Sequence, residues 1–295
     1  METRELIAKV RKIEIKTRRI VDEISGGAYH SVFKGRGIEF SEVREYTAGD
    51  DVRDIDWNVT ARMGNAYIKK YVEERELTVL IVMDVSASGD FGTIYESKRE
   101  KMAECAALLA FSAVRNHDKV GLLLYSDRTE LYLPPRSGKT HALRLIREMM
   151  ACEPRGTGTD LDAALEHLAA ARKKRAVIFL ISDFSGNRDY EQNLKILNQR
   201  HDVAAFRITD PWEWQMPLLP GMVIADAETG EHQSFTGNRK MLKNYSREAE
   251  KQFRIVQELF TQAKVDIMDL KCGEDPVKPL MKFFRTRWKQ KTAGI

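Results

Sequence analysis

The sequence predicts an α/β fold in which a mostly parallel central sheet carries helices on both faces. Two segments, "TVLIVMD" at 78–84 and "AVIFLISD" at 176–183, are apolar almost throughout. Strands with no polar face are typical of a parallel sheet that is covered on both sides, because an exposed face would alternate with polar residues. Helical patterns follow these strands along the chain, and a hydrophobic content of 43% is ample for one large core.

Apolar spacing and turn residues place the remaining elements of this α/β domain, which we expect to span 77–295. A Thr-Asp pair at 159–160 is a helix-capping signal, and the segment "AETGE" is typical of a hairpin turn. The expected elements are a helix over 96–115, strands over 120–125 and 130–135, helices over 141–150 and 160–173, strands over 176–183 and 203–209, a hairpin insertion at about 212–236, a helix over 239–263, a strand over 265–270 and a last helix over 277–289.

Residues 1–76 differ in character and are expected to form an accessory region that is partly β. Apolar residues between Leu6 and Ile24 are spaced as in an amphipathic helix. Short alternating segments around 38–43 and over 66–74 predict strands. The region also holds a group of acidic residues, for which a salt-bridged turn is favoured over a metal cluster because arginines are interleaved with them; the group is Asp50, Asp51, Asp54 and Asp56, with Arg53 and Arg62.

Composition excludes several classes of protein. The 48 basic and 44 acidic side chains leave a net charge of +4, and this positive charge is dispersed along the sequence. It does not form the basic patch that is typical of a nucleic-acid-binding protein. Cys105, Cys152 and Cys272 are widely spaced and odd in number, which indicates free thiols in a reducing compartment. No apolar run approaches the length of a membrane span, and the N-terminal residues lack the apolar core of a signal peptide. We therefore expect a cytoplasmic protein.

Oxygen-bearing side chains follow the ends of the predicted strands. Asp84, Ser86 and Ser88 come directly after the first apolar strand, Asp183 ends the second, and Thr159 lies in a loop that opens a helix. Ligands of open parallel sheets bind beyond the carboxyl ends of the strands, where such loops meet. In an extended segment, residues two apart point the same way, so Asp84, Ser86 and Ser88 are expected to face one point.

This donor set has the chemistry of a magnesium or manganese site. Two carboxylates and three hydroxyls, without sulfur or imidazole, suit Mg²⁺ or Mn²⁺ and disfavour zinc and copper. With only two carboxylates, the ion would remain electrophilic and could accept a carboxylate from another molecule. The pattern therefore predicts a docking point for a protein that presents an Asp or Glu side chain.

At these residues the chain resembles the von Willebrand factor type A (vWA) fold, which is Rossmann-like, and its metal-ion-dependent adhesion site (MIDAS). The signature of that site is Asp-x-Ser-x-Ser, a Thr in a second loop and an Asp in a third, and all of these positions are filled here. Thr159 is preferred over Thr157 because it stands at the right spacing before Ala164 and Leu165, and Thr157 remains an alternative.

The stretch "KGRGIEFSEVREYTAGDDVRDIDWNVTARMGNAYIKKYVEERE" and the later "DAETGE" resemble the bacterial domain-of-unknown-function family 58. This resemblance covers roughly residues 25–290. It implies a cytoplasmic bacterial protein that works with a MoxR-type AAA+ ATPase, or with a client of that ATPase, in chaperone-like or complex-assembly tasks.

The predicted function is therefore that of a non-enzymatic protein-interaction module. One alternative is a metal-dependent phosphohydrolase that uses Asp84 as nucleophile or metal ligand, although Ser86 stands where such enzymes carry a second aspartate. Another is a scaffold whose metal site is empty. The oligomeric state is not predicted.

Overall fold

In the computed structural model the chain forms two compact units. The smaller falls within residues 34–76, and the larger contains everything described from residue 77 onward. The predicted N-terminal helix within residues 6–24 lies outside the described residues, which are 39–47, 49–72, 76–93, 96–156, 158–172, 174–186, 188–217, 222–225, 232–235 and 239–293.

A six-stranded sheet forms the centre of the larger unit, in the order β10-β7-β6-β3-β4-β5. All neighbouring strands are parallel except β4 and β5, which are antiparallel. The strands are β3 (Thr78–Asp84), β4 (Lys119–Tyr125), β5 (Thr129–Arg136), β6 (Val177–Ser182), β7 (Asp202–Thr209) and β10 (Asp266–Lys271).

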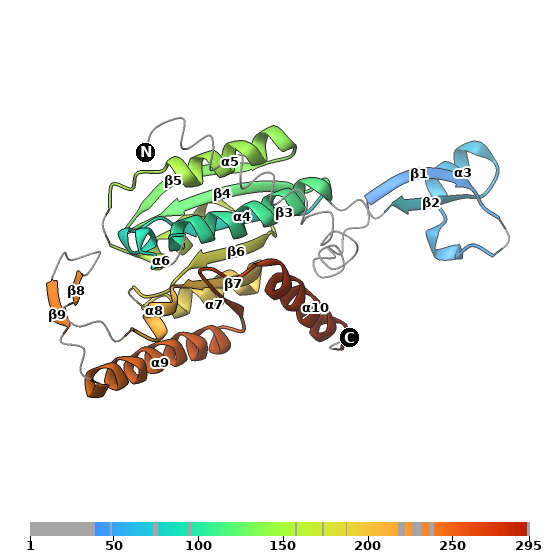
Figure 1. Ribbon diagram of the computed structural model, residues 1–295. Coiled ribbons are helices and arrows are strands. Elements are labelled where there is room, and N and C mark those ends of the chain that lie inside the picture. The colour runs from blue at the N-terminus through green and yellow to red at the C-terminus, as the bar shows by residue number, and fades with distance from the viewer. Residues whose placement is uncertain are drawn as a thin grey trace. The chain divides into compact units, whose positions relative to one another are not determined.

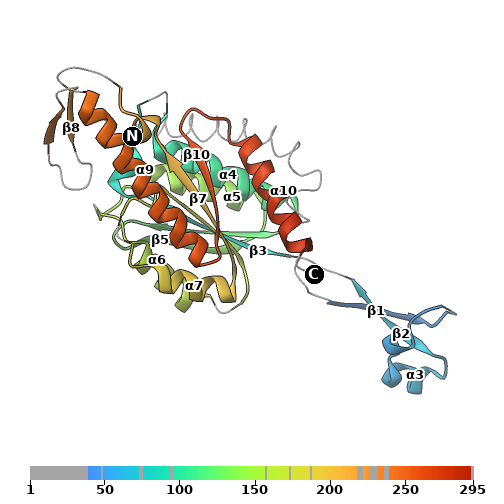
Figure 2. The same cartoon turned by 90° about the horizontal axis from the view of Figure 1, so that it is seen from below.

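Helices cover both faces of this sheet (Figures 1 and 2). One face packs against α4 (Lys98–Arg115), α5 (Lys139–Ala151) and α10 (Val277–Ala293), and the other against α6 (Leu161–Ala171), α7 (Glu191–Arg200) and α9 (Arg239–Gln262). Successive residues of β3 alternate between the two cores: Ile81 and Met83 belong to the first, Leu80 and Val82 to the second. The strands are apolar throughout because both faces of the sheet are covered by helices, as the sequence suggested. The predicted fold class is confirmed.

One helix of this arrangement was missing from the sequence prediction. Helix α7 joins β6 to β7, and such a parallel crossover needs a helix to return the chain. The segment buries only Leu194 and Leu197 among its described residues, so its apolar pattern is too weak to be recognised in isolation. Helix α4 also begins two residues later than expected, because Ser97 and Glu100 form a capping box that fixes its start.

The inserted hairpin lies between β7 and α9. Strands β8 (Met222–Ala225) and β9 (His232–Phe235) pair antiparallel, as predicted, while the turn between them lies outside the described residues. Before the hairpin, the short helix α8 (Pro211–Trp214) places the ring of Trp214 flat against Phe253 of α9, with centroids 3.6 Å apart. Helix α8 is therefore fixed to α9 by aromatic stacking.

The smaller unit is built on two antiparallel strands, β1 (Glu39–Glu45) and β2 (Tyr67–Val72). Both strands were predicted, whereas the helix between them, α3 (Trp57–Met63), was not. Three large apolar side chains of this unit are exposed: Val52 (59%), Trp57 (67%) and Met63 (62%).

Acidic residues of the smaller unit organise turns. Asp50 accepts two hydrogen bonds from the guanidinium of Arg44, at 2.9 and 2.7 Å, and these bonds lower the pKa of its carboxyl well below the usual range. Asp51 and Asp56 cap the helical segments that follow them. The salt-bridged turn is thus confirmed for Asp50, although its partner is Arg44 and not one of the interleaved arginines.

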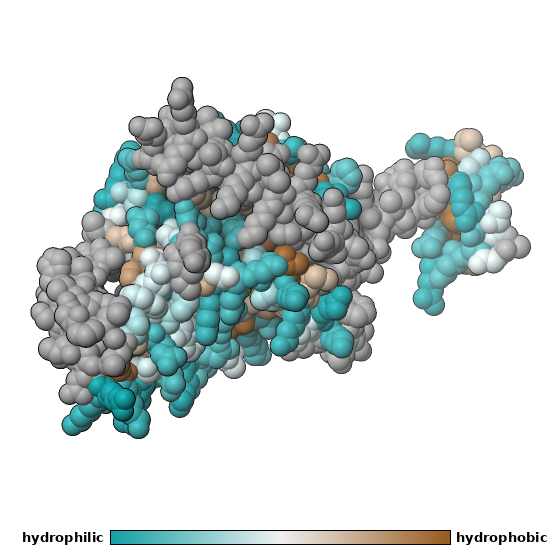
Figure 3. Space-filling model, in the orientation of Figure 1, coloured by the Kyte–Doolittle hydropathy of each residue, from teal (hydrophilic) through white to brown (hydrophobic). Residues whose placement is uncertain are grey.

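The surface of the larger unit is mainly hydrophilic where Figure 3 shows described residues. Cys105, Cys152 and Cys272 are all free, as predicted. Within the described parts of the chain, no helix is both long and apolar enough to cross a membrane.

Candidate functional site

The sheet topology brings Asp84 and Asp183 to the same edge. Strand β3 ends at Asp84, β6 ends at Ser182, and the two strands are parallel neighbours. The chain passes from β3 to β4 on one side, while β6, β7 and β10 extend the sheet on the other. The order of the strands therefore reverses beside β3, and ligands of α/β proteins bind at such a switch point.

The loop after β3 brings Ser86 and Ser88 together, but its conformation differs from the prediction. It is not extended: Ala87–Asp90 form a turn of 3-10 helix, with Ser86 at its N-cap and Ser88 inside it. The carbonyl of Ser86 accepts a hydrogen bond from the amide of Gly89 at 3.1 Å, which closes the turn. The expected alternation of an extended chain is therefore wrong, and helical curvature brings the two hydroxyls to 3.2 Å of each other instead.

Hydrogen bonds connect four of the five predicted site residues. The amide of Ser86 donates to Asp84 Oδ1 at 2.8 Å, the hydroxyls of Ser86 and Ser88 share a bond, and Ser88 Oγ donates to Asp183 Oδ2 at 3.1 Å. The second oxygen of Asp84 accepts from Ser182 Oγ at 2.7 Å. Asp84, Ser86 and Asp183 are 2%, 0% and 5% exposed, so these oxygens meet in a site largely shielded from water.

Thr159 lies against the same loop that carries Asp183. A Cβ atom built on Gly186 would stand 2.9 Å from both the Cβ and the carbonyl oxygen of Thr159, which is closer than real Cβ atoms approach. Only glycine therefore allows the two loops to meet at this distance. Thr157, the alternative to Thr159, lies outside the described residues.

This close approach predicts the effect of a single added methyl group. We expect Gly186→Ala to lower the free energy of unfolding by about 1–3 kcal/mol, because the Thr159 loop must shift to admit it. Gly158→Ala is the matched control, since its new Cβ would meet nothing nearer than 3.9 Å. Equal stability of the two variants in chemical denaturation would contradict the apposition of the two loops.

The structure adds two charged residues that the sequence reasoning missed. Lys98, the first residue of α4, places its ammonium 2.5 Å from Asp183 Oδ2 and 2.5 Å from Glu213 Oε1 of α8. The available signal was positional, because a helix that follows a strand in a parallel sheet starts at the edge where that strand ends. Glu213 is likewise the partner of Asp210 in a capping box directly after β7.

Burial and charge set the ionisation of the two aspartates. Burial, together with repulsion from Asp183, raises the pKa of Asp84 to about 6. Burial also acts to raise the pKa of Asp183, but the neighbouring ammonium of Lys98 outweighs it and lowers that pKa. The site therefore holds two neighbouring carboxylates, and one lysine, Lys98, compensates the charge of Asp183.

A divalent cation fits this donor set. Carboxylate and hydroxyl oxygens converge, and repulsion from Asp183 adds to the cost of ionising Asp84, which a cation between them would reduce. Across the described ranges, no group of three or more His, Cys, Asp and Glu side chains is placed to hold a metal. Any cation in this site would therefore depend on the serine and threonine hydroxyls.

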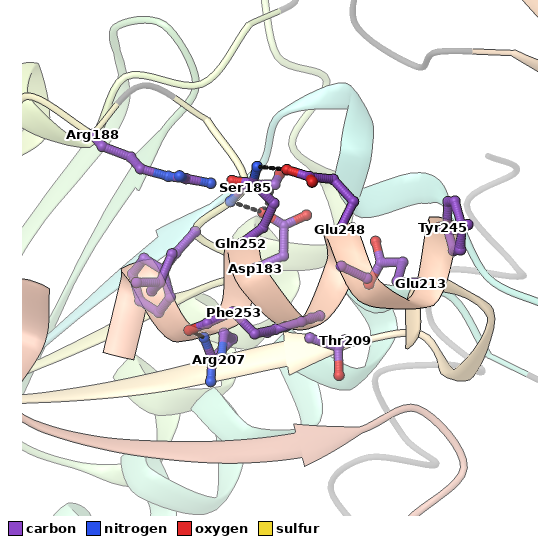
Figure 4. A pocket seen from close by; sticks show the side chains of 13 residues that line it. Asp183, Ser185, Arg188, Arg207, Thr209, Glu213, Tyr245, Glu248, Gln252 and Phe253 are labelled. Carbon is purple, nitrogen blue, oxygen red and sulfur yellow. Dashed lines mark hydrogen bonds between the residues drawn. The ribbon is translucent and has the colours of Figure 1, made fainter. Parts of the chain in front are cut away.

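A cavity of about 390 Å³ opens beside Asp183. Figure 4 shows polar side chains, among them Arg188 and Glu248, gathered around Asp183 and Ser185. Apolar side chains from the β6 loop and α9, including Phe184 and Phe253, also line the cavity. The site is thus continuous with a pocket that combines apolar walls and charged groups.

Comparison with known proteins identifies the family of the chain. The family model described as "Protein of unknown function DUF58" matches residues 42–254. The chain belongs to the DUF58 family. Its DUF58 resemblance, inferred above from two sequence segments, is therefore confirmed.

An uncharacterized protein of Mycobacterium tuberculosis is 28% identical over 291 residues, which cover 98% of this chain and 92% of that protein. An uncharacterized protein of Mycobacterium avium is 27% identical over 165 residues, which cover 55% of this chain and 97% of that protein.

Solved structures are similar to this DUF58 chain only at a distance. BatB from Bacteroides thetaiotaomicron has 15% sequence identity and a TM-score of 0.47, covering 72% of this chain and 99% of its own. The VWA domain of SpRpn10 has 12% identity and a TM-score of 0.39, covering 70% of this chain and 94% of its own. The assignment of the fold therefore depends on the sheet and its helices, described above.

Proposed function

We propose that this DUF58 protein is a protein-interaction module that binds one Mg²⁺ or Mn²⁺ ion and docks a carboxylate of its partner on that ion. Asp84 and Asp183 anchor the cation, Ser86 and Ser88 are direct ligands, and Thr159 completes the set. The observation that carries the proposal is the hydrogen-bonded chain from Asp84 through both serines to Asp183.

The chemistry of the donors supports an exchangeable role. Two carboxylates neutralise a divalent ion, and hydroxyls add no further charge, so the ion keeps an affinity for one more anionic oxygen. The carboxylate of an Asp or Glu side chain on another protein supplies such an oxygen. The cavity beside Asp183 offers room for a neighbouring side chain of the same partner. The partner that the family resemblance suggests is a MoxR-type AAA+ ATPase or its client, in a chaperone-like or assembly task.

The phosphohydrolase alternative meets one obstacle in the same geometry. Lys98, the lysine nearest to the site carboxylates described here, is held by Asp183 and Glu213. Magnesium-dependent hydrolysis of a generic phosphate ester that disappears in Asp84→Asn would nevertheless favour that alternative.

Calorimetric titration with Mn²⁺ tests the proposal directly. We expect uptake of one ion by the wild-type protein, competition by Mg²⁺, and no uptake by the double variant Ser86→Ala/Ser88→Ala, because two of the ligands are removed. The control is Ser112→Ala, which changes a buried serine in the last turn of α4. Absence of Mn²⁺ uptake by the wild type would refute the docking role and leave the scaffold alternative.

A further inference from the structure

Lys98 connects the proposed cation site to helix α8, because its ammonium lies 2.5 Å from Asp183 Oδ2 and 2.5 Å from Glu213 Oε1. Its side chain is 2% exposed, and its ammonium lies on Oδ2 of Asp183, the same oxygen that accepts the hydrogen bond of Ser88. A lysine ammonium therefore contacts the carboxylate oxygen to which a divalent ion would bind.

Charge makes these two arrangements exclusive. An ammonium and a divalent cation on the same carboxylate oxygen repel each other strongly in a site that is largely shielded from water. A buried lysine that loses its only partner is costly, but Lys98 has a second carboxylate in Glu213, which it already contacts. The ammonium can therefore give up Asp183 and remain paired.

We infer that Lys98 is a built-in competitor of the divalent ion: it holds Asp183 when the metal is absent and pairs with Glu213 alone when the metal is bound. The inference depends on the proposed cation site and adds a regulatory residue to it. With Asp84, Asp183 and Glu213 ionised, Lys98 leaves a net charge of −2, which one divalent ion balances. Lys98 thereby neutralises one of the three carboxylate charges and makes the bound metal readily exchangeable.

Mn²⁺ titration of Lys98→Met tests this inference. We expect this variant to bind Mn²⁺ at least about tenfold more tightly than the wild type, because the competing charge is gone. Lys101→Met is the matched control: Lys101 is equally buried on the same helix, but its ammonium pairs with Glu96 and Glu104. Its Mn²⁺ affinity should stay within about threefold of the wild type, since its charge lies on other carboxylates.

The outcomes separate the two proposals. Unchanged or weaker Mn²⁺ binding by a folded Lys98→Met, beside normal binding by the wild type, overturns the inference and leaves the cation site intact. No binding by either protein overturns the cation site itself. Binding by Lys98→Met alone would refute the docking role of the wild-type protein and still support Lys98 as the competitor of the ion.

A spectroscopic measurement covers the case in which Lys98→Met does not fold. The ¹⁵N signal of the Lys98 ammonium, assigned by its loss in Lys98→Arg, should shift when the wild type is saturated with Mg²⁺. A signal that stays in place while Mg²⁺ binds overturns the inference.

Discussion

Saturating Mg²⁺ should raise the melting temperature of the wild-type protein by roughly 5–10 °C. An ion present at a hundred times its dissociation constant stabilises the folded state by about 2.7 kcal/mol. For a domain of 150–250 residues, each kcal/mol is worth about 2–4 °C. We expect the ion to bind only the folded state, because Asp84 and Asp183 lie at the ends of separate strands and meet only through the sheet.

The double variant Ser86→Ala/Ser88→Ala should lose this gain while remaining folded. Both serines lie in the loop beyond β3 and contribute hydroxyls to the proposed site, so their removal leaves the apolar cores unchanged. Scanning calorimetry with Mg²⁺ and with a chelator gives the comparison, and Ser112→Ala should respond as the wild type does. A gain of equal size in the double variant would assign the stabilisation to another site.

Asp183→Ala should destabilise the protein by about 1.5–3 kcal/mol even when no metal is present, because it removes one of the two charged hydrogen-bond partners of a buried lysine and leaves Glu213 as the other. The side chains of Lys98 and Asp183 are 2% and 3% exposed, so water cannot replace the lost carboxylate. Urea unfolding monitored by circular dichroism gives the free energy of unfolding.

A double-mutant cycle identifies the cause of this loss. Adding Lys98→Met to Asp183→Ala should cost less than the two single losses together, since the lysine that Asp183 stabilises is then absent. Asp90→Ala is the matched control: Asp90 pairs with Arg99 at 2.9 Å, but its side chain is 69% exposed. Exposed pairs of this kind contribute about 0–1 kcal/mol. A loss as small for Asp183→Ala as for Asp90→Ala would show that Asp183 does not stabilise Lys98.

The elements that the sequence predicted well are those with strong local signals. Strands β3 and β6 carry uninterrupted apolar runs, and α6 begins directly after its capping residue Asp160. Helix α7 was missed because few of its residues face the core. The predicted extended conformation of the loop that carries Ser86 and Ser88 was also wrong. Two serines spaced two residues apart occur in extended segments and in 3-10 turns alike, so the sequence did not distinguish the two conformations.

The composition of the site followed from the same local signals. Acidic and hydroxyl residues directly after apolar strands indicated Asp84, Ser86, Ser88 and Asp183, and the structure brings these four together. Lys98 and Glu213 could not be found in this way, because they are 115 positions apart and neither follows a site motif. Their ion pairs depend on how α4 and α8 pack at the edge of the sheet.

The sequence by itself determined the covered sheet, the family and the oxygen donors, because burial and backbone preference act through neighbouring residues. Only the tertiary structure decided which charges meet. Pairing between distant residues depends on the order of the strands and the approach of the helices, and these arise from the packing of the two cores. The lysine on Asp183 is the clearest result of that packing, since it places a cation of the protein's own on one of the proposed metal ligands.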